Sequence, residues 1–342
     1  MSTPTLTARP SRAAALDGLG RYVPIGATVA LLALMYLGGL GNYRNFDNPQ
    51  LIPDLFIGNA GLLIIGVGMT FVILSGGIDL SVGSVMAFST MACAWLTVDA
   101  GVSAPLAVGL VLALGVVSGT LTGIVIHYFD VQPFIATLVG LFLYRGLTLQ
   151  ISAEDVSMRD VAFFDWGMTR VEFGGSPREG GFSLPYLSFL ALAVVAIAFV
   201  VLHYTRFGRG VYAVGGNEQS ALLMGLPVAR TKVGVYAISG FCAALAGVVS
   251  AFYTKSADPL RGVGLELDAI AAVVIGGTLL TGGAGFVLGT VAGVMVMGLL
   301  STIIAFQGNL NSWWAKIVVG VLLLAFILLQ RVLARSGEKR RT

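Results

Sequence analysis

Residues 55–83 read LFIGNAGLLIIGVGMTFVILSGGIDLSVG, and they indicate a helical membrane protein. The apolar run at 55–75 has the length that one α-helix needs to cross a bilayer, roughly 20 residues. It ends at a Gly-Gly pair followed by one acid, Asp79, and a second apolar segment begins at residue 84. Because the runs are continuous and do not alternate at period two, a transmembrane β-barrel is disfavoured.

The composition of the whole chain leads to the same class. Of its 342 residues, 56% are hydrophobic and 11% are charged, whereas soluble domains carry about 25% charged residues. So little charge cannot cover a soluble surface, and the mean hydropathy of +0.90 excludes an intrinsically disordered chain. The net charge of +3 is too small to indicate a nucleic-acid partner, so the lipid bilayer is the expected surrounding.

Ten apolar segments follow one another along residues 23–330, which we expect to form the transmembrane domain. The third and the eighth are short for a span, and both adjoin Gly-Gly pairs, which is typical of broken or re-entrant helices that line a cavity. We therefore predict an all-α polytopic membrane protein of about ten transmembrane helices, some broken or re-entrant at Gly-Gly motifs. The segments are 23–41, 55–75, 84–98, 104–128, 131–151, 184–204, 232–253, 268–281, 286–306 and 313–330.

The distribution of positive charge predicts the orientation. Arginine and lysine gather in the N-terminal tail (1–22), the loop at 205–231 and the C-terminal tail (331–342), whereas the insert at 152–183 has six acids against three arginines. We therefore expect both termini and the 205–231 loop in the cytosol and the insert outside. The apolar segment at 23–41 lacks a clear cleavage site, so we interpret it as a retained first span.

The Gly-Gly motif occurs twice in the chain. Residues 76–83 (GGIDLSVG) and 276–283 (GGTLLTGG) share the pattern Gly-Gly-x-x-Leu-Ser/Thr-x-Gly, with apolar helix expected on both sides. Internal repeats are common in transporters, although glycine-rich helix packing produces similar matches. The candidates for a pathway or a helix break are Gly76, Gly77, Asp79, Ser81, Gly83, Gly276, Gly277 and Thr278.

Motifs for catalysis are missing from the sequence. None of the four lysines follows a glycine, which excludes a phosphate-binding P-loop, and no His-Glu-x-x-His, Cys-x-x-Cys or Gly-x-Ser-x-Gly pattern occurs. We interpret His127 and His203 as interfacial residues and Cys93 and Cys242 as buried thiols. The chain is therefore expected to be no enzyme and to hold neither a metal nor a cofactor of its own.

Three ionisable residues lie within or beside apolar runs: Asp79, Arg145 and Lys316. Ion-coupled carriers place such groups deep in the bundle, so their scarcity argues against an ion gradient as the energy source. We expect Asp79 to cap the helix that begins near Ser81 or Ser84, with a ligand contact as the alternative. Arg145 is expected to extend to the interface, with a polar substrate contact as the alternative.

The loop at 205–231 contains one short predicted helix. Asn217 suits its N-cap, Glu218 its first turn and Gly225 its C-terminal cap, and Pro227 follows. Such a helix either lies on lipid headgroups or docks on a soluble partner. Its apolar surface is offered by Ala221, Leu222, Leu223 and Met224.

Residues 67–85 (VGMTFVILSGGIDLSVGSV) resemble the signature of the permease subunits of bacterial ABC importers for ribose, xylose, arabinose and galactofuranose. Residues 205–208 (TRFG), 264–271 (GLELDAIA) and 274–278 (VIGGT) are similar to the same family, and the resemblance runs from about residue 59 to residue 330. Residues 310–317 (LNSWWAKI) and 328–331 (LLQR) look most like one of the two permeases of the galactofuranose importer.

This resemblance implies a transport subunit in the bacterial inner membrane. In such importers a periplasmic sugar-binding protein delivers the sugar, and a coupling helix of the permease binds an ABC ATPase subunit that carries ATP and Mg²⁺. It also implies pairing with a second permease chain, in a heterodimer or a homodimer. The residues matching the coupling helix are Asn217, Glu218, Ala221, Leu222, Leu223, Met224 and Gly225.

Two other functions stay open at this point. An ion-coupled secondary transporter of a small neutral solute would have the same overall architecture, but its uptake would need only an ion gradient. A membrane-embedded enzyme would need polar groups that converge at one depth, which the inventory of charged residues does not provide.

Overall fold

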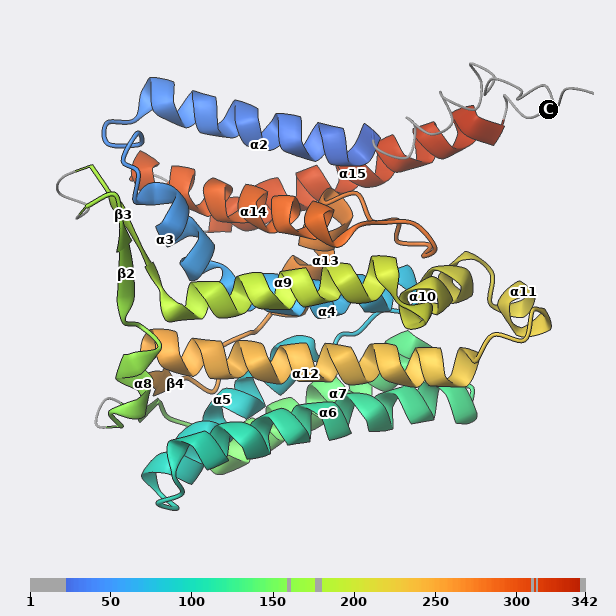
Figure 1. The fold of residues 1–342 in the computed structure, drawn as a ribbon, viewed down its shortest axis with the longest axis horizontal. Coiled ribbons are helices and arrows are strands. Elements are labelled where there is room, and N and C mark those ends of the chain that lie inside the picture. The colour runs from blue at the N-terminus through green and yellow to red at the C-terminus, as the bar shows by residue number, and fades with distance from the viewer. Residues whose placement is uncertain (1–22, 159–160, 176–179, 309–310, 312, 339–342) are drawn as a thin grey trace, which may run out of the picture.

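The protein forms a bundle of long helices that run along one common direction (Figure 1). The structure is a computed structural model that describes residues 23–158, 161–175, 180–308, 311 and 313–338, with side chains up to residue 332. The N-terminal tail at 1–22 and residues 339–342 of the C-terminal tail lie outside the described residues.

Seven of the described helices are long and apolar enough to cross a membrane by themselves. An eighth span is possible if α3 (Leu51–Gly58) and α4 (Ala60–Leu74), which meet at an angle of 57°, are counted together. The seven are α2 (Val23–Asn42), α6 (Ala104–Tyr128), α7 (Pro133–Ile151), α9 (Tyr186–Tyr204), α12 (Val228–Thr254), α14 (Val287–Gln307) and α15 (Trp313–Glu338).

The prediction of an all-α polytopic membrane protein is confirmed, but the expected count of about ten spans is too high by length. All ten apolar segments contain helix, yet α5 (Val82–Val98) and α13 (Leu265–Ile275) are shorter than a span. The segment at 55–75 is also not one straight helix. It bends at Asn59, whose side-chain amide donates a 2.7 Å hydrogen bond to the carbonyl of Leu55.

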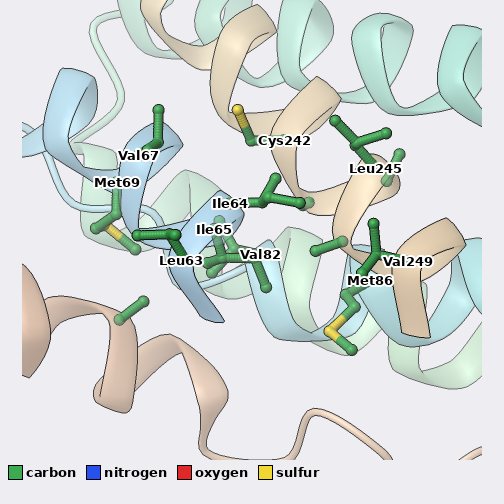
Figure 2. Close-up of a cluster of buried hydrophobic side chains, with 14 of the residues drawn as sticks. Leu63, Ile64, Ile65, Val67, Met69, Val82, Met86, Cys242, Leu245 and Val249 are labelled. Atoms are coloured by element: carbon green, nitrogen blue, oxygen red, sulfur yellow. The ribbon is translucent and has the colours of Figure 1, made fainter. Parts of the chain in front are cut away.

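The core lies around α12, which packs against α4, α5 and α6. Apolar side chains from these helices interdigitate there, including Ile64, Met86 and Leu245 (Figure 2). Cys93 and Cys242 are buried free thiols in this region, as the sequence predicts. The core therefore fixes α4 and α5, which flank the first Gly-Gly motif.

Short strands gather at one end of the bundle, at the left of Figure 1. Within the insert, β2 (Arg170–Phe173) and β3 (Phe182–Pro185) form an antiparallel pair, and α8 (Phe163–Trp166) precedes them. β1 (Val156–Ser157) pairs with β4 (Ser256–Ala257), which ties the insert to the turn after α12. The insert and the 205–231 loop thus lie at opposite ends of the molecule (Figure 1).

Candidate functional site

The 205–231 loop contains two helices, α10 (Arg206–Gly216) and α11 (Glu218–Leu223). The predicted short helix is α11, and its caps are those expected: the Asn217 side chain accepts a 2.7 Å hydrogen bond from the N–H of Ser220. Gly225 has φ +73°, the left-handed conformation that glycine adopts most readily. The N–H groups of Gly225 and Leu226 bond to the carbonyls of Leu222 and Ala221, which closes a Schellman motif.

The surface of α11 divides into an anchored side and an exposed side. Ala221 is fully buried and packs with Val214 of α10 and Val228 of α12. An ion pair of 2.6 Å between Lys232 and Glu218 fastens the same side to α12. The exposed side consists of Leu222, Leu223 and Met224, whose exposed fractions are 64%, 88% and 68%. Three adjacent exposed apolar side chains at the end of the bundle form a surface to which another molecule can bind.

α10 is a helix that the sequence did not reveal. Its N-cap is Thr205, whose hydroxyl accepts a 3.1 Å hydrogen bond from the N–H of Gly208. Its signal was the spacing of Phe207, Val211 and Val214 at i, i+4 and i+7, with Arg206 and Arg209 between helical turns, which suits an amphipathic helix. Because α10 runs directly into Asn217, it connects α11 to the bundle.

The first Gly-Gly motif is a break between α4 and α5. Gly76 has φ +83°, which turns the chain immediately after α4. Asp79 is 2% exposed and accepts hydrogen bonds from the N–H of Ser81 at 2.9 Å, from its hydroxyl at 2.6 Å and from the hydroxyl of Ser239 at 2.6 Å. Asp79 therefore stabilises the turn before α5 and joins it to α12. It does not bond the first-turn N–H groups of α5, as a cap of that helix would.

The second Gly-Gly motif follows α13. Gly277 has φ +92°, and Thr278 is fully buried. Side chains from two distant helices bond to carbonyls at the end of α13: the hydroxyl of Thr28 donates to Ile275, and the amide of Gln330 donates to Val274 at 3.2 Å. The end of α13 is thus held between α2 and α15 inside the bundle.

The two motifs meet each other and the end of α10. The N–H of Gly283 donates a 2.9 Å hydrogen bond to the carbonyl of Leu74, at the end of α4. A Cβ atom on Gly215 would lie 1.7 Å from that carbonyl oxygen and 2.7 Å from the nitrogen of Gly283. A Cβ atom on Gly282 would lie 2.9 Å from the nitrogen of Gly76. Main chain therefore touches main chain at a junction of three segments, which we call the glycine junction.

The other polar residues singled out from the sequence have structural partners. The guanidinium of Arg145 donates to the carbonyls of Pro259 and Arg261 at 2.9 and 3.1 Å, and its extension to the membrane interface stays a prediction. Lys316 forms an ion pair with Asp268. The candidate pathway roles of the glycines and of Thr278 stay predictions.

A helical membrane bundle with interrupted helices is an architecture that many membrane transporters use. Residues 55–327 match the family described as the permease component of the branched-chain amino acid transport system, and the chain belongs to this family. It is therefore a transport component and not an enzyme.

Individual relatives resemble the chain over most of its length. It is 44% identical over 322 residues to the inner membrane ABC transporter permease protein YjfF of Escherichia coli, covering 94% of this chain and 96% of that protein. It is 41% identical over 322 residues to the fructose import permease protein FruG of Bifidobacterium longum, covering 94% of each. It is 41% identical over 270 residues to the ribose import permease protein RbsC of E. coli, covering 78% of this chain and 80% of that protein. No solved structure gives a significant match.

Proposed function

We propose that the chain is the permease subunit of an ATP-driven sugar importer of the bacterial inner membrane. The substrate class follows from two of the relatives, which are named for fructose and ribose import. The motifs at 310–317 and 328–331 narrow the proposal to a monosaccharide of the galactofuranose type, with a pentose as the alternative. The observation that supports coupling to an ATPase is the exposed apolar edge of α11, which consists of Leu222, Leu223 and Met224.

In this proposal the α11 end of the bundle faces the cytosol. Supporting it, the start of α2 and the end of α15 lie at the same end as α11, opposite to the insert (Figure 1). The N-terminal tail (1–22) and the basic tail (331–342) are then cytosolic, residues 23–330 form the transmembrane domain, and 152–183 is periplasmic. A periplasmic sugar-binding protein would deliver the sugar on the insert side.

The energy comes from a partner chain in this proposal. An ABC ATPase subunit binds ATP and Mg²⁺ and receives the coupling helix, which extends from Asn217 to Gly225, in a groove. A second permease chain completes the sugar pathway at the interface between the two, in a heterodimer or a homodimer. Closure of the ATPase pair moves α11 and switches the pathway between its outward-open and inward-open forms.

The experiment is uptake by proteoliposomes that contain this chain, its ATPase, the second permease and the binding protein, with ATP enclosed on the ATPase side. Leu223→Ala and Met224→Ala remove exposed apolar side chains from α11 and are expected to lower uptake severalfold or more, with insertion intact. Phe129→Ala is the matched control, because Phe129 is 72% exposed in the turn after α6, and α6 ends at the same end of the bundle as α11 (Figure 1). Normal uptake and sugar-stimulated ATPase activity in both α11 variants would contradict the coupling assignment.

The competing function is an ion-coupled secondary transporter of a small neutral solute. Vesicles with the chain alone and an imposed Na⁺ or H⁺ gradient distinguish the two. Uptake there without ATP or an ATPase would favour the secondary transporter, whereas uptake only with ATP and the partner chains supports the importer.

A further inference from the structure

Four charged side chains lie around the start of α13, a region that we call the α13 face. They belong to three helices: Arg145 to α7, Glu266 and Asp268 to α13, and Lys316 to α15. Arg145 lies six residues before the end of α7, which corresponds to a depth of about 9 Å along the helix. The face therefore carries charge within a membrane-spanning part of the molecule.

This face is also a surface of the single chain. Of the seven long spans, α7 and α15 are the least buried. Between them the chain exposes Leu260, Val263 and Leu267, whose exposed fractions exceed 60%. Charged groups inside membrane-spanning segments almost always face the bundle interior, a water-filled cavity or another charge. In the proposed importer, this face is therefore expected to adjoin the second permease and the aqueous pathway.

Three of the four charged groups already have partners that fix them. Lys316 and Asp268 form an ion pair, and the Arg145 guanidinium is held by the carbonyls of Pro259 and Arg261. Arg145 thereby fastens the segment that leads from β4 into α13. These two hydrogen bonds position the segment, and a contact of Arg145 with a polar substrate stays a prediction.

Glu266 forms no ion pair within 4 Å of a described residue, but its carboxylate is stabilised by the charge of Arg145 and by the N–H groups of Gly264 and Glu266 at the start of α13. Its carboxylate also lies beside the main chain at the start of α5. A Cβ atom on Gly83 would lie 2.6 Å from Oε2 of Glu266 and 2.5 Å from the carbonyl oxygen of Gly262. The absence of a side chain at Gly83 thus makes room for this carboxylate next to the first break. A carboxylate only accepts hydrogen bonds, and the hydroxyl groups of a sugar are neutral donors that suit it.

We propose that Glu266 contacts the transported sugar and accepts hydrogen bonds from its hydroxyl groups in the outer part of the pathway. This inference rests on the proposed function, since it names a residue that recognises the substrate of that function. The contact lies between the entry side and the glycine junction, so a sugar bound there is next to both α5 and α13.

The experiment uses the complete reconstituted complex at a saturating concentration of sugar-loaded binding protein. Uptake of D-ribose, D-fructose and D-galactose first establishes which of them the unmodified complex transports. Singly deoxygenated forms of that sugar are then compared in the unmodified complex and in Glu266→Gln. The variant is expected to take up the parent sugar about tenfold more slowly, as expected for losing one hydrogen bond to a charged group. One deoxy sugar lacks the hydroxyl group that donates to Glu266. For that sugar, the unmodified complex and the variant are expected to have similar uptake rates.

Asp268→Asn is the matched control, because Asp268 lies on the same turn of α13 but is occupied by Lys316. This variant is expected to lower the uptake rates of the parent sugar and of every deoxy sugar by the same factor, or to leave all of them unchanged. If Glu266→Gln lowers the uptake rates of all sugars by the same factor, or leaves them unchanged, Glu266 does not contact the sugar. If that variant does not assemble, Glu266→Asp provides the same comparison, because it keeps the charge and withdraws it by one methylene. Failure of the unmodified complex to import any of the three sugars would instead contradict the proposed function.

Discussion

The hydroxyl of Ser239 in α12 donates a 2.6 Å hydrogen bond to the carboxylate of Asp79, 160 positions earlier in the chain. Both side chains are almost completely buried. The bond connects the most central helix of the bundle to the turn that follows Gly76 and Gly77. A buried acid in a membrane bundle thus serves here to hold a break in place.

Ser239→Ala is expected to destabilise the protein by about 1–3 kcal/mol, because it leaves one oxygen of a buried carboxylate without its donor. The measurement is the midpoint of thermal unfolding in detergent. Asp79→Asn should have a similar effect, and the double variant should cost clearly less than the sum of the two, since both changes remove one interaction. Additive losses would show that the two side chains act independently.

Gly215→Ala is expected to disrupt the glycine junction. The added methyl would lie 1.7 Å from the carbonyl oxygen of Leu74, so main chain has to move, and we expect both the unfolding midpoint and sugar uptake to fall. Gly216→Ala is the control at the next position, where a Cβ atom meets nothing within 4 Å. Both changes replace glycine by alanine at the end of α10, so a large difference between them reports the junction.

The close packing of α6 on α12 is tested by replacing two glycines of α6, one at the contact and one away from it. A Cβ atom on Gly119 would lie 2.0 Å from the carbonyl oxygen of Tyr236, whereas one on Gly109, in the same helix, meets nothing within 4 Å. Small residues at such contacts let membrane helices approach closely. Gly119→Ala should therefore lower the unfolding midpoint by the equivalent of about 1–3 kcal/mol, and Gly109→Ala should leave it nearly unchanged. Equal midpoints in the two variants would contradict the close contact.

The left-handed Gly225 sets the direction in which the chain leaves α11. Replacement by valine is strained at φ +73° by roughly 1–2 kcal/mol, while asparagine tolerates this region. Uptake by the reconstituted importer is expected to fall in the order Gly, Asn, Val, with membrane insertion unchanged. Equal uptake in Gly225→Val and the unmodified chain would show that the exit angle of α11 has no effect on coupling.

Much of this architecture follows from local patterns. Continuous apolar runs locate the spans, and Asn217 and Gly225 delimit α11, because caps and helix ends depend on neighbouring residues alone. The bend at Asn59 and helix α10 escaped prediction. The bend depends on one side chain competing for a carbonyl, and α10 is amphipathic and too polar to appear as an apolar segment.

The arrangement of the candidate site could not be predicted, because its contacts join distant parts of the chain. Arg145 binds carbonyls more than 110 positions away, and Ser239 reaches Asp79 across 160. The repeat of the Gly-Gly pattern was visible in the sequence. That its two copies touch each other, and that Gly215 lies between them, required the tertiary structure.

The glycine junction has a mechanical consequence. Side chains can absorb a displacement by changing rotamer, but main-chain atoms in direct contact have no such freedom. Gly215, Gly283 and the carbonyl of Leu74 therefore behave as a rigid joint between α10 and the two interrupted helices. In the proposed importer, a movement imposed on α11 is therefore expected to reach both interrupted helices at the same time.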